Sequence, residues 1–104
     1  MSTITMKKRI YRDAPNYIVL LPPGEILEEK LQEMELNAEG LAERSELSVE
    51  TIRNILNVKI AVTYEIAEQL EKATRIPIEN WLRYEDAYHQ KLEYSKRHPE
   101  IPVY

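Results

Sequence analysis

The sequence has no cysteine, only two glycines and no long apolar run. The absence of cysteine excludes disulfides, thiolate nucleophiles and thiolate metal sites. The longest apolar run, Tyr17 to Leu21, has five residues, whereas a membrane-spanning helix needs about 20. No long apolar segment follows the bases near the N-terminus, so a secretory signal is not expected. Two isolated glycines also leave no glycine-rich phosphate loop.

Positive charge is in short supply. The 104 residues contain 14 lysines and arginines against 18 aspartates and glutamates, a net charge of −4. Because sequence-independent binding to nucleic acids depends on bases that neutralise phosphates, this balance argues against general nucleic-acid affinity. The charge is uneven, however, since residues 1–22 carry a local +3. That cationic end either contacts a groove or phosphate of DNA or is a solubilising terminus.

Residues suited to catalysis are few. The two histidines, His89 and His98, lie near the C-terminus, and neither has a partner carboxylate at a metal-ligand spacing. The many carboxylates recur at helix-surface spacing, which is typical of solvated helix faces. The sequence therefore predicts no enzyme, no metal site and no cofactor.

The chain length indicates one domain, and signals for five helices follow one another along it. Proline at a first helical position and polar N-cap residues mark the helix starts, and these are Pro23, Asn37, Ser48, Thr63 and Pro77. From these starts we expect helices from residue 23, over about 38–44, from about 49 to 56 or 57, over about 64–74, and over about 77–94. Gly40 is a weak point in the second helix, because it costs about 1 kcal/mol relative to alanine.

The ends of the chain differ from the helical part. The segment NYIVLL, residues 16–21, predicts a short strand or an extended arm, because it is rich in β-branched and aromatic residues. No second strand pattern follows, so it must pair with another chain, pair with its own copy in a dimer, or lie on the helices. Two prolines in residues 98–104 exclude a helix there. The predicted organisation is an arm over 1–22, a helical domain over 23–95 and a tail over 96–104.

The second and third helices have the pattern of a helix-turn-helix. This motif needs a small residue where its helices cross, apolar residues around the crossing, and a turn of about three or four residues. Ala42 is the small residue, and the turn ends at Ser48. The surrounding apolar residues are Leu41, Leu47, Ile52 and Ile55. The sequence therefore predicts an all-α fold that contains a helix-turn-helix.

An ordered set of short motifs over residues 23–88 resembles the HigA/VapI-type antitoxins, a branch of the phage-repressor-like (XRE) helix-turn-helix family. The motifs are Pro23-Gly24-Glu25-Ile26-Leu27, Leu41-Ala42, Asn57 with Lys59, Thr63, Trp81-Leu82 and Tyr88. The resemblance implies a five-helix repressor-like helix-turn-helix domain with an extended N-terminal arm. The chain departs from the family pattern at four positions, which are Ala38, Val58, Ile60 and Glu85. The resemblance leads us to expect a phosphate-contacting glutamine in place of Ala38, a glycine in place of Val58 and a base in place of Ile60, with a glutamine in place of Glu85. The first three departures remove phosphate contacts or alter a loop near the DNA backbone.

The recognition helix supplies the expected DNA contacts, by the docking geometry of this motif and by the resemblance. Arg53 could pair with guanine and Asn54 with adenine. Val49 could touch a thymine methyl group. Glu50 could accept from a cytosine amino group or simply favour the first helical turn, and Arg53 could also be a solvated base. The full set of expected DNA-binding residues is Ser48, Val49, Glu50, Thr51, Arg53, Asn54, Asn57 and Lys59, with Ser48 also serving as a cap.

The resemblance implies two functions. The protein would repress its own operon by binding operator DNA, and it would neutralise a HigB-like RNA-cleaving toxin. Its expected location is the bacterial cytoplasm, at the nucleoid. An acidic face on the first helix would complement a basic toxin, and its residues are Glu25, Glu28, Glu29 and Glu33. A homodimer is expected because helix-turn-helix readers usually bind paired half-sites. Its interface is predicted at Tyr84, Tyr88 and Leu92, although Tyr88, like Trp81, could instead fill the core.

Two other functions fit the sequence. One is a protein-interaction module that has kept the helix-turn-helix fold and lost DNA binding, which the acidic balance and the departures at Ala38, Val58 and Ile60 favour. The other is a free-standing transcriptional repressor without a toxin.

Overall fold

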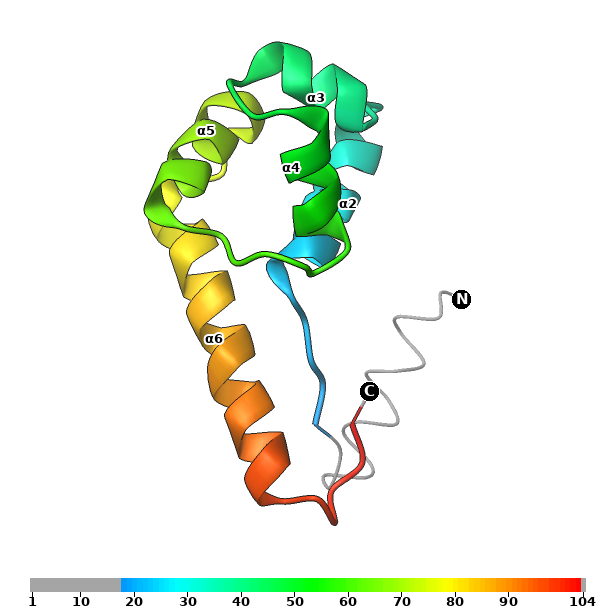
Figure 1. The fold of residues 1–104 in the computed structure, drawn as a ribbon, viewed down its shortest axis with the longest axis vertical. Helices are drawn as coiled ribbons and strands as arrows, with labels where there is room; N and C mark the ends of the chain where they lie inside the picture. The colour runs from blue at the N-terminus through cyan, green and yellow to red at the C-terminus, as the bar shows by residue number, and fades with distance from the viewer. Residues whose placement is uncertain (1–17, 104) are drawn as a thin grey trace. The chain divides into compact units, whose positions relative to one another are not determined.

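The computed structural model describes residues 18–103, which divide into two compact units. One unit is Leu21–His89, and the described part of the other is residues 18–20 and 90–103. Within residues 18–103 there are five helices and no strand. Figure 1 shows how the chain passes through these helices. The helices are α2 (Pro23–Met34), α3 (Ala38–Arg44), α4 (Val49–Leu56), α5 (Tyr64–Thr74) and α6 (Ile78–Arg97). The all-α prediction is confirmed, while residues 1–17 of the predicted arm lie outside the described residues.

Local capping explains where α3, α4 and α5 begin. The side chains of Asn37, Ser48 and Thr63 each accept a hydrogen bond from a backbone N–H three residues further along, at 2.8, 3.0 and 3.3 Å respectively. Each bond satisfies one of the N–H groups that a helix start leaves without an intrahelical partner. Pro23 is the first residue of α2, where its missing N–H costs nothing. The predicted helix starts for these elements are confirmed.

The core of the Leu21–His89 unit lies where these helices meet. α4 packs against both α2 and α3, and α3 also packs against α5 (Figure 1). The apolar stripes of all five helices contribute buried side chains, which include Leu27, Leu31, Leu41, Ile52, Ile55, Ala67, Leu70 and Trp81. Ala42 is half-buried and packs against this cluster, as a small residue at a helix crossing should. The helix-turn-helix predicted from the sequence is therefore formed by α3 and α4.

The turn between α3 and α4 is held by hydrogen bonds within the turn and by one to α5. The Ser45 hydroxyl donates to the carbonyl of Leu41 at 3.0 Å and accepts from the N–H of Leu47 at 3.2 Å. The N–H of Glu46 donates to Oε1 of Gln69, on α5, at 3.0 Å. The angle between the two helices is therefore held by α5 as well as by the turn itself.

Gly24 allows α2 to approach the main chain at the end of α4. It is buried, and a Cβ atom built on it would lie 2.3 Å from the carbonyl oxygen of Ile55 and 3.0 Å from that of Leu56. No side chain fits in that space. The glycine of the PGEIL motif therefore sets the distance between the first helix and the helix that follows the turn.

The end of α6 lies further along the chain than the sequence pattern indicated. The helix continues to Arg97 rather than ending near Tyr94. It ends before His98, because a residue that precedes proline, here Pro99, is disfavoured in the helical conformation. None of the helices within residues 18–103 is long and apolar enough to cross a membrane.

Residues 16–21 were predicted to form a short strand or an extended arm, and of these two alternatives the strand is wrong for the described part. Residues 18–21 contain only an isolated parallel bridge from Ile18 to Val103, and residues 16 and 17 lie outside the described range. The N–H of Ile18 donates to the carbonyl of Pro102 at 2.9 Å. The segment thus pairs with the chain's own tail, a partner that the sequence analysis did not consider. The two prolines keep that tail out of a helix, which leaves the Pro102 carbonyl free to accept.

Candidate nucleic-acid interface

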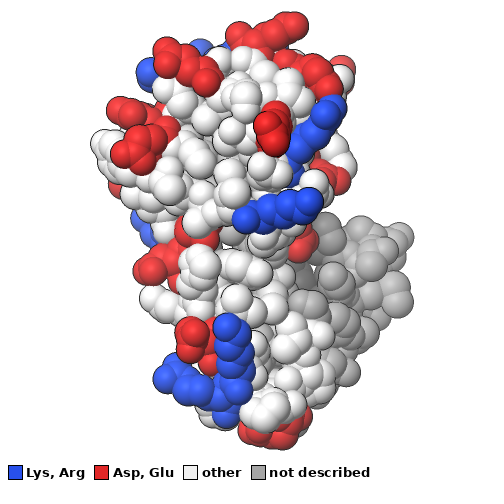
Figure 2. All heavy atoms as spheres, in the orientation of Figure 1, with Lys and Arg blue, Asp and Glu red and all other residues white. Residues whose placement is uncertain are grey.

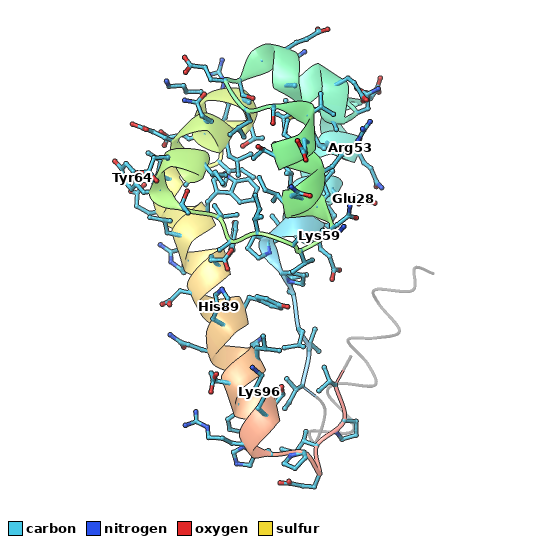
Figure 3. All side chains as sticks on the ribbon, in the orientation of Figure 1. Glu28, Arg53, Lys59, Tyr64, His89 and Lys96 are labelled. Atoms are coloured by element: carbon cyan, nitrogen blue, oxygen red, sulfur yellow. The ribbon has the colours of Figure 1, made fainter. Side chains whose placement is uncertain are left out.

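The helix α4 has one buried face and one polar face. Ile52 and Ile55 anchor it in the core, at 0% and 1% exposure. Of the expected DNA-binding residues, those exposed to solvent are Ser48, Glu50, Arg53, Asn57 and Lys59, and those half-buried are Val49, Thr51 and Asn54. Figure 3 labels Arg53 on α4 and Lys59 in the loop that follows it. The structure therefore brings the predicted set together along one short helix and its two ends.

Ser48 is fully engaged as a cap. Its hydroxyl accepts from the N–H of Thr51 and donates to Oγ1 of the same residue at 2.9 Å. This arrangement orients the Thr51 side chain as well as the first turn of α4. The first turn also contains Glu50, whose carboxylate is favoured by the positive end of the helix dipole.

The Arg53 guanidinium has a partner that the sequence analysis missed. Its Nη2 forms an ion pair with Oε2 of Glu39, in the first turn of α3. Both side chains are more than half exposed, at 58% and 52%. The two residues are 14 apart on different helices, so no helical spacing in the sequence relates them. Only the crossing of α3 and α4 brings them into contact.

The end of α4 closes in a Schellman motif with valine in the position that favours glycine. Val58 has a φ angle of 59°, its N–H donates to the carbonyl of Ile55 at 3.1 Å, and the N–H of Lys59 donates to that of Asn54 at 2.8 Å. This pair of bonds satisfies carbonyls that the helix end leaves open. A β-branched residue with positive φ is strained. The backbone here thus keeps the conformation suited to the family's glycine.

The loop after Lys59 is tied down by Glu85, another residue whose role the sequence analysis missed. Oε1 of Glu85, in α6, accepts from the N–H of Val62 at 2.8 Å, and its Oε2 contacts Nε2 of His89. The expectation that His89 has no partner carboxylate is therefore wrong. The Glu85 side chain is only 14% exposed. It therefore fixes the far end of the loop whose near end presents Lys59.

The surface around α4 is mixed in charge. Basic side chains lie over α4 and the loop after it, with acidic side chains around them on the face shown in Figure 2. Ala38, where the family has a phosphate-contacting glutamine, is 8% exposed and presents no polar side-chain atom. Ile60 is 38% exposed and adds apolar surface where a base is common. The cations available to phosphate near α4 are therefore few.

The acidic face predicted on the first helix is formed by α2. Its four carboxylates are all exposed, and they are Glu25, Glu28, Glu29 and Glu33. Figure 3 labels Glu28 on α2. Glu33 forms an ion pair with Lys30 at 2.7 Å, which neutralises part of the charge at one end of the face.

The aromatic residues of α6 divide between core and surface. Trp81 is completely buried, as expected of a core residue, and Tyr84 packs edge-on against it with ring centroids 5.7 Å apart. Tyr88 is half-buried beside His89, and Leu92 is half-buried in the second unit. Tyr84 thus contributes to the core of its own unit, and a dimer interface at these residues stays a prediction.

Residues 18–103 contain no group of three or more histidine, aspartate or glutamate side chains placed to hold a metal ion.

Solved structures with a similar fold identify the family of this chain. The chain is similar to an addiction module antidote protein of the HigA family from Coxiella burnetii, with 31% sequence identity, a TM-score of 0.72, and coverage of 79% of this chain and 90% of that one. The chain belongs to the HigA family. The resemblance stated from the sequence motifs is thereby confirmed.

Two further structures have the same fold. A candidate antidote protein of a plasmid maintenance system from Nostoc punctiforme is 25% identical, with a TM-score of 0.70 over 77% of this chain and 88% of that one. The antitoxin HigA of Pseudomonas aeruginosa, solved with the higBA promoter, is 23% identical, with a TM-score of 0.70 over 79% of this chain and 90% of that one. No protein-family model matches the chain, and no curated protein does.

Proposed function

We propose that this HigA-family chain is an antitoxin that represses its own operon by binding operator DNA through α4 and that also neutralises a cognate RNA-cleaving toxin. The observation that carries the DNA-binding part is the exposed polar face of a rigidly capped α4, with Arg53 on it. The Pseudomonas aeruginosa relative, which was solved with promoter DNA, supports the same use of the fold.

The side chains on α4 suit sequence reading better than general adhesion to DNA. A guanidinium can donate two hydrogen bonds to guanine, and the Asn54 amide can bond both edge atoms of adenine. Each such pair discriminates against a wrong base by about 1–3 kcal/mol. Because the chain carries a net charge of −4 and few cations near α4 can reach phosphate, we expect affinity for unrelated DNA to be low.

Homodimerisation is part of the proposal, because two copies double the few phosphate contacts of one α4 and match two half-sites about one turn apart. The half-buried Tyr88 of α6 is the residue we select to test it. Sedimentation equilibrium of a Tyr88→Glu chain would show a monomer if this side chain lies in the interface, and an unchanged dimer would place the interface elsewhere.

DNA binding is tested by fluorescence anisotropy with the duplex upstream of the chain's own gene and an unrelated duplex, at two salt concentrations. The Arg53→Ala, Asn54→Ala double variant should lose at least about tenfold in affinity for the operator, since both base contacts are removed. Lys72→Ala is the matched control, because Lys72 is an exposed base on α5 and its loss changes the net charge as much. That variant should retain the preference for the operator.

Two results would contradict the DNA-reading proposal. Binding that falls equally in the double variant and in Lys72→Ala would indicate charge attraction without reading. A wild-type chain with no preference for the operator, with or without toxin, would favour instead a protein-interaction module that has lost DNA binding. The buried Ala38 and the exposed apolar Ile60 are the observations on the side of that second function.

The toxin-binding part of the proposal rests on the acidic face of α2. Opposite charge across an interface mainly accelerates association. Glu28→Gln, Glu29→Gln should therefore slow association with the proposed basic toxin, whose gene we expect beside this one, and the difference should shrink at high salt. The matched control is Glu65→Gln, Glu68→Gln, two exposed carboxylates on α5. Equal slowing in both double variants would show that only net charge matters. The absence of any such toxin gene would favour a free-standing repressor.

We propose no enzymatic activity for this protein. Its functions are binding functions, it needs no cofactor, and its place of action would be the bacterial cytoplasm, where operator DNA and toxin are found together.

A further inference from the structure

The ion pair between Glu39 and Arg53 joins the two helices of the helix-turn-helix at their exposed surface. Nη2 of Arg53 contacts Oε2 of Glu39, and both side chains remain more than half exposed. Among the described residues, Glu39 is the ion-pair partner of Arg53. An exposed ion pair of this kind contributes little to folding stability. Since the pair adds little stability, its location on Arg53, the residue expected to contact guanine, indicates a role in DNA recognition.

Glu39 is held on a rigid element. It lies between the buried Ala38 and Gly40, whose N–H is bound by the Asn37 cap at 2.8 Å. Arg53 lies in turn between Ile52, which is completely buried, and the half-buried Asn54. Both ends of the ion pair are thus anchored by the core, so the contact restricts where the flexible arginine side chain can point.

The contact leaves most of the guanidinium available. An arginine side chain has five N–H donors in one plane, and Glu39 engages the Nη2 edge. The remaining donors can still pair with the two acceptor atoms of guanine. Without such a support, a long side chain must be ordered when DNA binds, which lowers affinity by about two- to tenfold.

Resting on the proposed DNA-reading function, we propose that Glu39 is a positioning residue that holds Arg53 for guanine recognition and so raises specificity at one base pair. The charge of the Glu39 carboxylate would also raise specificity for the operator. Glu39 is in the first turn of α3, and a negative charge near phosphates lowers affinity for every sequence alike. It therefore weakens binding to unrelated DNA while it supports reading of the operator.

Two substitutions of Glu39 distinguish the effect of its contact with Arg53 from the effect of its negative charge. Glu39→Asp keeps the charge but is one methylene shorter, so it loses the contact with Arg53. Glu39→Gln keeps the length and loses the charge. Both are exposed, helix-compatible changes, and a urea unfolding midpoint close to that of the wild type would establish that the fold is intact in each.

The experiment measures affinity for the operator, for an operator whose contacted guanine pair is replaced, and for an unrelated duplex. Glu39→Asp should lower the ratio of operator to replaced-operator affinity by about two- to tenfold, with affinity for the unrelated duplex unchanged. Glu39→Gln should raise affinity for the unrelated duplex. In an Arg53→Ala background, Glu39→Asp should have no effect on the ratio, because the residue to be positioned is gone.

An unchanged ratio in Glu39→Asp would overturn the inference, and so would a higher ratio, which would make Glu39 a competitor of DNA for Arg53. Either result leaves the proposed function intact, since the wild type still prefers its operator. A wild-type chain without any preference would instead overturn the proposed function and this inference together.

Discussion

Replacing Gly24 with alanine should destabilise this protein even though alanine is the better helix former. The added Cβ would lie 2.3 Å from the Ile55 carbonyl oxygen, and ordinary contact begins at 3.4 Å. The start of α2 and the end of α4 must therefore separate by about 1 Å. Because the obstructing atoms belong to the main chain, no side-chain rotation can relieve the clash.

The magnitude follows from two opposed terms. Overpacking of a filled interior costs about 1–3 kcal/mol, and alanine recovers at most about 1 kcal/mol relative to glycine in a helix interior. Gly24 is in the first turn of α2, where that gain is smaller. We expect a net loss of about 2 kcal/mol. At a urea dependence of about 1.5 kcal/mol/M, the unfolding midpoint falls by about 1.3 M.

The matched control is Gly40→Ala. The nearest atom to a Cβ at that position is Cδ2 of Leu36 at 2.9 Å, the end of a side chain that can move, and Oδ1 of the capping Asn37 lies at 3.3 Å, which requires only a small shift. Its urea midpoint should stay level or rise, because alanine is favoured in a helix. A Gly24→Ala chain as stable as the wild type, or two variants equally destabilised, would refute the reasoning from main-chain contact.

Three other changes test the packing around the candidate interface. Val58→Gly should stabilise the fold by about 1 kcal/mol and raise the melting temperature by several degrees, because glycine relieves the strain of a positive φ. Val58→Ala should stabilise it less. No increase in stability in either variant would contradict strain at this position. Glu85→Ala should lower the stability by about 1–2 kcal/mol and accelerate hydrogen exchange at the N–H of Val62. Glu85→Gln keeps an acceptor and should protect that amide. Equal exchange rates in the wild type and both variants would argue against the hydrogen bond between Val62 and Glu85. Trp81→Ala should cost about 3–5 kcal/mol in urea unfolding. Trp81→Phe should cost clearly less, because a phenyl ring fills most of the space that the indole occupies, and equal losses would count against packing as the source of the cost.

The helix starts could be predicted because their causes are local. Asn37, Ser48 and Thr63 cap helices within three residues of themselves, and that spacing is visible in the sequence. The apolar stripes predicted the core for the same reason, since each repeats along one helix. The C-terminal end of α6 was predicted too early, because no residue within the helix marks it. The end is set instead by Pro99, since the residue before a proline is disfavoured in the helical conformation.

Contacts between elements could not be predicted from the same signals. Glu39 meets Arg53 across 14 residues, and Gln69 meets the turn at Glu46 across 23. Such pairs depend on how helices cross, which no spacing within one helix records. The same holds for Ile18, whose partner at the other end of the chain has no strand pattern of its own. The positions of the expected DNA-binding residues were predictable from the motif, whereas the side chains that hold them were not.

The contact at Gly24 has a consequence for how two ligands would influence one another. Between α2 and the carbonyl end of α4 there is no side chain at this point that could change rotamer and absorb a small displacement. A partner that shifts α2 must shift α4 with it. Whatever factor such a partner applies to the affinity of α4 for DNA, DNA must apply to the affinity of α2 for that partner, since linkage is reciprocal. A glycine that makes no contact with either ligand would then set the strength of their thermodynamic coupling.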